Sequence, residues 1–415
     1  MSEFYLAIEP YVYIFVTGNE ALLFNTLDSN SFLTDDLGVV RIVEILNSGD
    51  GLYVAKLSNE ELESDTCKAF ISFLRHNYMG DILPFELCKK KPVQLRPLLN
   101  IQTDINLNRN ENKELEIPSI LQYLTNISLI LNESSNSQFS KITKQANFNP
   151  ANKSLPVNEI DFTLVKNTLN RLKETLYYIN LNGIEIFKYS KLFELISLLE
   201  NYDAIKELHC NLKNLALNIS KLENRALTNF HFSISISLNE FDRDEFLRTF
   251  SFLQTKKIVH DFKFLIENME QYGKTEKLIA IYNIESYSIL PFYNGGNLAF
   301  FKEMVFIDKD DILNDKKEMN QILANEAINS YFFGKIHIVP SGDVYISLNE
   351  AKIGNLFRID ISEIVYNEMN NEGIWFLTRT KISPCKNCIY CSLCPPISNY
   401  ELSIGQFNLC SIINN

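Results

Sequence analysis

The sequence predicts an α/β protein in which a partial (β/α) barrel stands between a winged-helix-like N-terminal unit and a β-rich C-terminal module. Strand-like and helix-like patterns alternate from about residue 118 to 310, which is typical of a parallel sheet. Three short strands followed by helices are predicted before residue 90, and five of the eight cysteines lie after residue 384. These observations divide the chain into segments 1–90, 118–315 and 325–415.

The N-terminal unit, residues 1–90, begins with a predicted hairpin. Two runs of apolar, aromatic and β-branched residues flank the turn Thr17-Gly18-Asn19-Glu20, and a short third strand and three helices follow. Asp36 and Asp65 stand where helix N-caps are expected. The predicted elements are strands 11–16, 21–24 and 31–34 and helices 37–46, 59–63 and one from Asp65 that carries Phe70, Phe73 and Leu74 on one face.

A winged-helix shape is used for binding either DNA or peptides. DNA is disfavoured because the unit carries many acidic residues and no basic recognition helix. The whole chain has 39 basic and 51 acidic residues and a net charge of −12, which also disfavours nucleic acid and anionic membranes. Peptide binding is the remaining interpretation of this unit, because a short edge strand can pair with an extended peptide. We expect such a groove between the strand residues Phe32, Leu33 and Thr34 and the helix residues Phe70, Phe73 and Leu74.

The middle segment, 118–315, is predicted to hold six parallel strands joined by helices. The carboxyl ends of such strands usually bear the chemistry. They show no nucleophile beside a base, no paired carboxylates and no phosphate loop, and the five histidines share no metal or triad spacing. Gly183 and Glu185, which follow the second strand, are weak signals on their own. The predicted strands are 127–131, 176–181, 205–210, 231–237, 261–265 and 287–291, and the predicted helices are 161–175, 191–200, 212–222, 242–255 and 275–282.

The cysteines of the last segment predict a metal site. Cys385, Cys388, Cys391 and Cys394 form a run that closes on proline, and Cys410 follows. The N-terminus lacks a secretory signal pattern and no apolar run is long enough for a membrane span, so we expect a cytoplasmic protein with reduced thiols. The two Cys-x2-Cys pairs are too close to act as separate zinc knuckles, which favours iron–sulfur ligation over zinc.

The C-terminal pattern resembles the SPASM domain, the auxiliary-cluster module of peptide-modifying radical SAM maturases. The pattern consists of a hairpin over 335–346, Gly354-Asn355-Leu356, a helix over 361–370, Trp375, and Cys385-x2-Cys388-x5-Cys394 followed by Cys410. The middle segment is similar to the radical SAM partial barrel, and the N-terminal unit is similar to the PqqD-like peptide-recognition element of those maturases. This resemblance implies that Cys385, Cys388, Cys394 and Cys410 ligate one auxiliary [4Fe–4S] cluster, with Cys391 as an alternative ligand.

The sequence departs from that family at the cofactor site. The family's Cys-x3-Cys-x2-Cys loop would lie at 132–145, but no cysteine occurs between Cys88 and Cys210. The family's Gly-Gly-Glu-Pro appears as Gly183-Ile184-Glu185-Ile186, so Gly183 and Glu185 are remnants of a site for S-adenosylmethionine. Two further family cysteines, which belong to the first auxiliary cluster, are replaced by Ser347 and Ser398.

These departures resemble the pseudo-radical-SAM proteins of ribosomal-peptide maturation systems. The resemblance implies a non-catalytic protein without a functional S-adenosylmethionine site. It would bind the leader of a precursor peptide and act beside an active radical SAM maturase. Two alternatives remain open at this stage: an electron-relay or residual enzymatic subunit of the maturase, and a scaffold stabilised by zinc.

Overall fold

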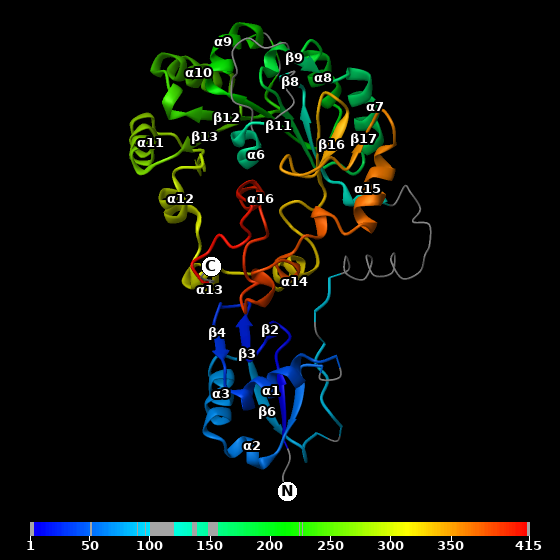
Figure 1. The fold of residues 1–415 in the computed structure, drawn as a ribbon, viewed down its shortest axis with the longest axis vertical. Coiled ribbons are helices and arrows are strands. Elements are labelled where there is room, and N and C mark those ends of the chain that lie inside the picture. The colour runs from blue at the N-terminus through cyan, green and yellow to red at the C-terminus, as the bar shows by residue number, and fades with distance from the viewer. Residues whose placement is uncertain are drawn as a thin grey trace.

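The computed structural model describes residues 4–49, 52–88, 90–95, 97–99, 120–134, 139–147, 157–223, 225 and 227–412. The N-terminal unit lies at one end of the molecule and the β/α sheet at the other (Figure 1). Part of the C-terminal segment, coloured from yellow to red in Figure 1, lies between them, its orange strands join the sheet, and the segment contacts both ends. Among the described residues, no helix is long and apolar enough to cross a bilayer.

Two three-stranded antiparallel sheets form the N-terminal unit, in the orders β5-β1-β6 and β2-β3-β4. The hairpin, the third strand and the three helices are where the sequence predicts them. Asp36 caps the first helix through the Val39 amide, but Asp65 is the first residue of the third helix and not its cap. The elements are β1 Phe4–Ile8, β2 Val12–Thr17, β3 Glu20–Asn25, β4 Ser31–Thr34, α1 Leu37–Asn47, β5 Val54–Leu57, α2 Asn59–Glu63, α3 Asp65–His76 and β6 Gly80–Pro84.

The predicted order of three strands and three helices omits β1, β5 and β6. The two later strands are short, and β6 contains glycine, aspartate and proline, which are rare in strands. Strand β1 pairs with both of them across about 50 and 75 residues, so tertiary pairing and not local pattern makes them strands. The comparison with a winged helix therefore stays a prediction.

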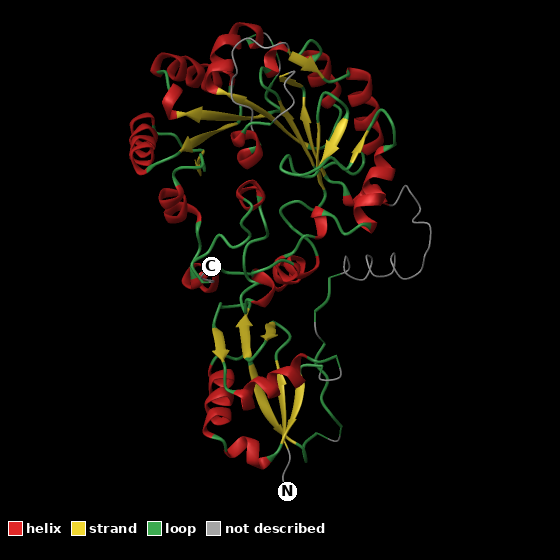
Figure 2. Ribbon diagram, viewed as in Figure 1, coloured by secondary structure: helices red, strands yellow, loops and turns green. Residues whose placement is uncertain are grey.

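The six predicted barrel strands are all present and run parallel in sequence order. Helices α7 to α11 cover the outer face of this sheet (Figures 1 and 2). Helix α11 is longer than predicted because Asn268 caps it at the Gln271 amide. The elements are β7 Asn126–Ile130, α7 Phe162–Leu172, β10 Tyr178–Asn182, α8 Leu192–Leu199, β11 Ile205–Asn211, α9 Leu212–Leu222, β12 His231–Ser237, α10 Arg243–Lys256, β13 His260–Ile266, α11 Met269–Tyr282 and β14 Tyr287–Pro291.

The C-terminal segment extends the same sheet. Strand β15 (Lys335–Ile338) pairs in parallel with β7, and β16 (Asp343–Tyr345) and β17 (Gly354–Asn355) continue it, giving a nine-stranded sheet that stays open. One hydrophobic core therefore runs from Ile120 to Phe376 across the segments that the sequence divides at 315–325. The remaining elements are β8 Asn132–Ser134, α6 Lys141–Ala146, β9 Val157–Glu159, α12 Leu298–Val305, α13 Lys309–Asn314, α14 Met319–Ala327, α15 Ile361–Asn370 and α16 Asn399–Ile404.

Candidate metal centre

All five C-terminal cysteines line one small cavity between the cysteine run and the chain end. The run is folded into successive short turns, in which the amides of Cys388 and Cys391 bond to the carbonyls three residues earlier at 2.9 and 3.1 Å. Such turns bring side chains three residues apart to one side of the backbone. Cys410 returns to the same place because its segment bridges Ile307 in parallel, through two backbone bonds of 3.2 and 3.0 Å.

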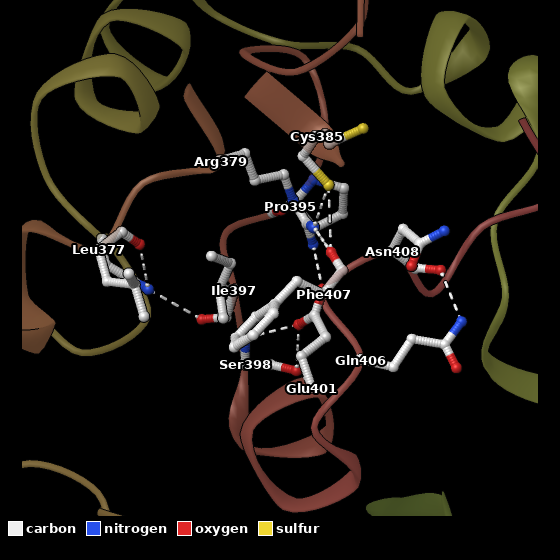
Figure 3. A network of polar contacts seen from close by, with 12 residues as sticks. Leu377, Arg379, Cys385, Pro395, Ile397, Ser398, Glu401, Gln406, Phe407 and Asn408 are labelled. Carbon is white, nitrogen blue, oxygen red and sulfur yellow. Dashed lines mark hydrogen bonds and ion pairs between the residues drawn. The ribbon is translucent and has the colours of Figure 1, made fainter. Parts of the chain in front are cut away.

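A buried ion pair supports the turn that carries Cys385 (Figure 3). Arg379 and Glu401 are 8% and 2% exposed, and Arg379 Nη2 lies 2.6 Å from Glu401 Oε1. The same guanidinium donates to the carbonyls of Pro395 and Phe407 and lies 3.6 Å from Cys385 Sγ. One side chain thus joins the beginning of the cysteine run to its end and to the chain before Cys410.

The second carboxylate oxygen of Glu401 takes part in the N-terminal cap of helix α16. It accepts the Ser398 amide at 2.7 Å and the Ser398 hydroxyl at 2.9 Å, which makes a capping box. Ser398 is one of the two serines that stand where the resemblance in the sequence would place cysteines. The other, Ser347, is fully buried and donates to Asn399 Oδ1 at 2.8 Å. Both serines therefore act in local hydrogen bonding.

Burial raises the pKa values of the Cys385, Cys388, Cys391 and Cys394 thiols. Desolvation raises the pKa of Cys394 to about 12 and that of Cys391 to about 11. A thiolate at either position is costly unless a cation neutralises it. Soft thiolates favour iron–sulfur clusters or zinc, so the donor set fits either group.

Other predicted ligands lie close enough to Cys394 to affect its thiol. Burial raises the pKa of Cys394, Arg379 lowers it, and Cys388, Cys385 and Cys410 raise it further, whereas Cys388 raises the pKa of Cys391. Cys391 Sγ instead lies 3.7 Å from the Ser392 hydroxyl. As the side chains stand, no three His, Cys, Asp or Glu groups of the described residues converge on one metal-binding point, and the Cys385 thiol donates to the Phe407 carbonyl. The thiols are therefore gathered at one cavity, and ligation requires their side chains to turn inward.

The N-terminal sheet packs directly on the cysteine run. Tyr13, Leu22 and Phe24 share a small core with residues of the run, including Ile389 and Leu393. Tyr13 also donates its hydroxyl to Glu326 Oε1 at 2.6 Å. Because residues between the candidate ligands contact the sheet, the orientation of the N-terminal unit depends on the conformation of the run.

The residues predicted to bind a peptide have two different environments. The Phe32 ring lies 5.0 Å from the Phe70 ring and 5.1 Å from the Phe73 ring, between centroids, so β4 and α3 are adjacent. Phe70 and Leu74 are fully buried and hold the core together. The residues that remain at least partly accessible are Phe32, Leu33, Thr34 and Phe73, and β4 is an edge strand among the described residues.

Gly183 and Glu185 both contact Asn132, the first residue of β8. A Cβ atom at Gly183 would lie 2.5 Å from Asn132 Oδ1. The Asn132 side chain also bonds to both the carbonyl and the amide of Glu185, at 2.8 and 3.1 Å. The Glu185 carboxylate pairs with Lys188. The glycine is thus required for close contact with Asn132. Of segment 132–145, the structure describes 132–134 and 139–145.

Sequence analysis missed a set of polar residues on the inner face of the sheet. Asn180, Glu207 and Lys263 line a cavity there, in the first half or the middle of their strands, and His209 lines it two residues further along β11. Functional residues were expected only at the carboxyl ends of the strands, so residues within the strands were not considered. The signal is present in the sequence as polar residues at every second position of consecutive strands.

The chain matches no protein-family model and no curated protein. Among solved structures it is similar to anSMEcpe with bound AdoMet, at 12% identity and a TM-score of 0.42, over 68% of this chain and 92% of that one. Structures of anSMEcpe with AdoMet and the Cp18Cys or Kp18Cys peptide align at 13% identity and a TM-score of 0.41, over 68% of this chain and 95% or 96% of theirs. At these identities and TM-scores, the likeness carries no argument about binding of AdoMet or of a peptide by this chain.

Proposed function

We propose that this chain is a non-catalytic, radical-SAM-like partner protein. It binds a ribosomally made precursor peptide and assists its modification by an active radical SAM maturase, and it carries one auxiliary [4Fe–4S] cluster. The observation that carries the proposal is the contrast between two sites. Five cysteines line the candidate metal centre, whereas Asn132 packs against the backbone at Gly183 and no cysteine occurs between Cys88 and Cys210.

The cluster has a structural role in this proposal. When bound by Cys385, Cys388, Cys394 and Cys410, it would link turns that are distant in sequence and would have no open iron for a substrate. Arg379 positions the first of these turns through Glu401 and the Phe407 carbonyl. The N-terminal sheet packs on the same run, so a loaded centre also holds the peptide-binding unit in place.

The peptide leader would add itself as a strand along β4. Strand β4 has one paired side, toward β3, and its other side is not paired within the described residues. Main-chain bonds along this edge give affinity, and the apolar side chains beside it give selectivity. Leu33 is 38% exposed and Phe73 is partly buried, so both can contact the leader.

Titration of a fluorescent leader peptide, taken from a short reading frame beside the gene, tests this proposal. We expect saturable binding by the full chain and a loss of at least tenfold in Leu33→Glu, because a buried carboxylate is introduced at the contact. Ile45→Glu is the matched control, because Ile45 is also exposed but lies on α1. Absence of binding up to high micromolar concentrations, or equal binding by both variants, would reject the proposal.

Metal analysis separates the two alternatives from the main proposal. A brown protein with iron and sulfide after anaerobic purification supports a cluster, whereas a colourless protein with zinc supports a scaffold. An electron relay requires the cluster for turnover of the maturase. It is excluded if a mixture with Cys385→Ser and Cys388→Ser protein turns over as well as one with the unmodified chain.

A further inference from the structure

The inner face of the sheet is polar where a parallel sheet is usually apolar. Parallel strands that are covered on both faces tend to be continuous apolar runs. Here Ser128, Asn180, Glu207 and Lys263 alternate with apolar residues that face the outer helices. The same alternation places Lys335 and His337 on the inner face of β15. A polar inner face of this extent indicates a lumen that contains water or a ligand.

A cavity of about 350 Å³ occupies this lumen, within the range of small-molecule sites. The sheet forms one wall. The opposite wall comes from the end of α6, at Asn147, and from the C-terminal segment, at Tyr331 and Asn399. The cavity is thus formed by the fold itself, is partly open to the surface, and shares no lining residue with the candidate metal centre or with β4.

One row of polar groups in this cavity is satisfied within the chain. The ladders place His337, Ser128, Asn180 and Glu207 side by side across four strands. Ser128 donates to Asn180 at 3.1 Å, and Asn180 donates to Glu207 at 3.0 Å. Lys263 pairs with the same carboxylate at 3.1 Å. Ser128, Asn180, Glu207 and Lys263 thus form one connected network in which the two opposite charges are paired.

The neighbouring row holds a cation without a counter-ion. Lys335 stands opposite Asn126 in the ladder, and Asn126 stands opposite Tyr178. The Lys335 ammonium lies 5.1 Å from the centre of the Tyr331 ring, and no carboxylate of the described residues pairs with it. Burial lowers the pKa of Lys335, and burial together with Lys335 lowers the pKa of His337 to about 4. With neutral histidines, the lining has two lysines and one glutamate and an excess of one positive charge.

We propose that this cavity binds a ligand through a single carboxylate held between the Lys335 ammonium and the Asn126 amide. One unpaired ammonium beside neutral amides matches a monoanion. A phosphate dianion is disfavoured, because Glu207 stands one row away. The carboxylate belongs either to a peptide or to a small free acid. This inference does not depend on leader binding, which takes place on the N-terminal unit.

Affinity-selection mass spectrometry tests the site with three probes. These are a library of N-acetylated tetrapeptides with free carboxyl termini, the same library as carboxyl-terminal amides, and a mixture of aliphatic monocarboxylic acids. We expect retention of carboxylates and a loss of about ten- to a hundredfold for the matched amides, which is the range for losing a charge-assisted bond. Retention of the peptides identifies a peptide carboxylate, and retention of the acids alone identifies a small ligand.

Variants assign the binding to the cavity. Lys335→Met should abolish retention, whereas Lys274→Met, which removes a charge from the exposed outer helix α11, should leave it unchanged. Should Lys335→Met fail to fold, protection of Lys335 from reductive methylation by the retained ligand provides the same test on the unmodified protein. The proposal is overturned if no probe is retained, if amides bind as well as carboxylates, or if Lys335 is methylated equally with and without the ligand.

Discussion

Replacing Glu401 by glutamine removes the negative half of a buried ion pair beside the candidate metal centre. The substitution keeps the size of the side chain but leaves the Arg379 guanidinium, 8% exposed, without its counter-ion. Removing one partner of a buried pair costs about 3–5 kcal/mol, because the other charge stays desolvated. Glutamine can still accept one bond from Ser398, so we expect the loss to lie near the middle of this range.

A double-mutant cycle isolates the pair. Arg379→Met removes the stranded charge, so the double variant should lose less than the sum of the single losses, by about 2 kcal/mol or more. Glu372→Gln is the matched control, because its pair with Lys381 is half-exposed, and it should cost less than about 1 kcal/mol.

Urea unfolding measured by tryptophan fluorescence provides the assay. Trp375 is the only tryptophan of the chain, is fully buried and lies just before Arg379, so it reports on this region. The reasoning is refuted if Glu401→Gln is no more destabilising than Glu372→Gln, or if the two single losses in the cycle simply add.

Three further predictions concern other buried contacts. Burial raises the pKa of Glu368 from 4.5 to about 7. Between these pH values the folded chain binds more protons than the unfolded chain, so the free energy of unfolding falls as the pH rises. Glu368→Gln should therefore stabilise the chain by about 1–3 kcal/mol in urea unfolding at pH 8 and leave it unchanged at pH 4. Gly183→Ala should cost about 1–3 kcal/mol in the same assay, since its Cβ would meet Asn132, and the same change should cost much less in an Asn132→Gly background, where that side chain is absent. Tyr13→Phe leaves the Glu326 carboxylate without its 2.6 Å donor and should speed proteolysis within 85–99 at least severalfold; an unchanged rate would show that this contact does not hold the N-terminal unit.

The sequence predicts the barrel well because its signals are local. Each of the six strands is an apolar or alternating run, and helices follow at short intervals, so pattern alone places them. The clustering of Cys385 to Cys394 is likewise local. The clustering alone does not show whether Cys391 or the other cysteines are the ligands. That assignment depends on the turns of the run and on the position of Cys410 beside Ile307.

Local sequence patterns could not predict contacts between segments that are distant along the chain. Strands β5 and β6 exist because β1 pairs with them, and the packing of Tyr13 on Glu326 joins residues 313 positions apart. The burial of Phe70 and Leu74 also follows from tertiary packing, since a helical stripe does not show which members face a partner. The alternation of polar and apolar residues along the strands can be seen in the sequence. It identifies a polar inner face only once the structure shows which face of the sheet the helices cover.

Cleavage of S-adenosylmethionine by the isolated chain distinguishes a non-catalytic partner protein from an active enzyme. The anaerobically reconstituted protein is incubated with S-adenosylmethionine and dithionite, and 5′-deoxyadenosine is quantified by mass spectrometry. We expect iron and sulfide for one cluster and no 5′-deoxyadenosine above a protein-free blank. Formation of 5′-deoxyadenosine in proportion to the amount of this chain would contradict this expectation.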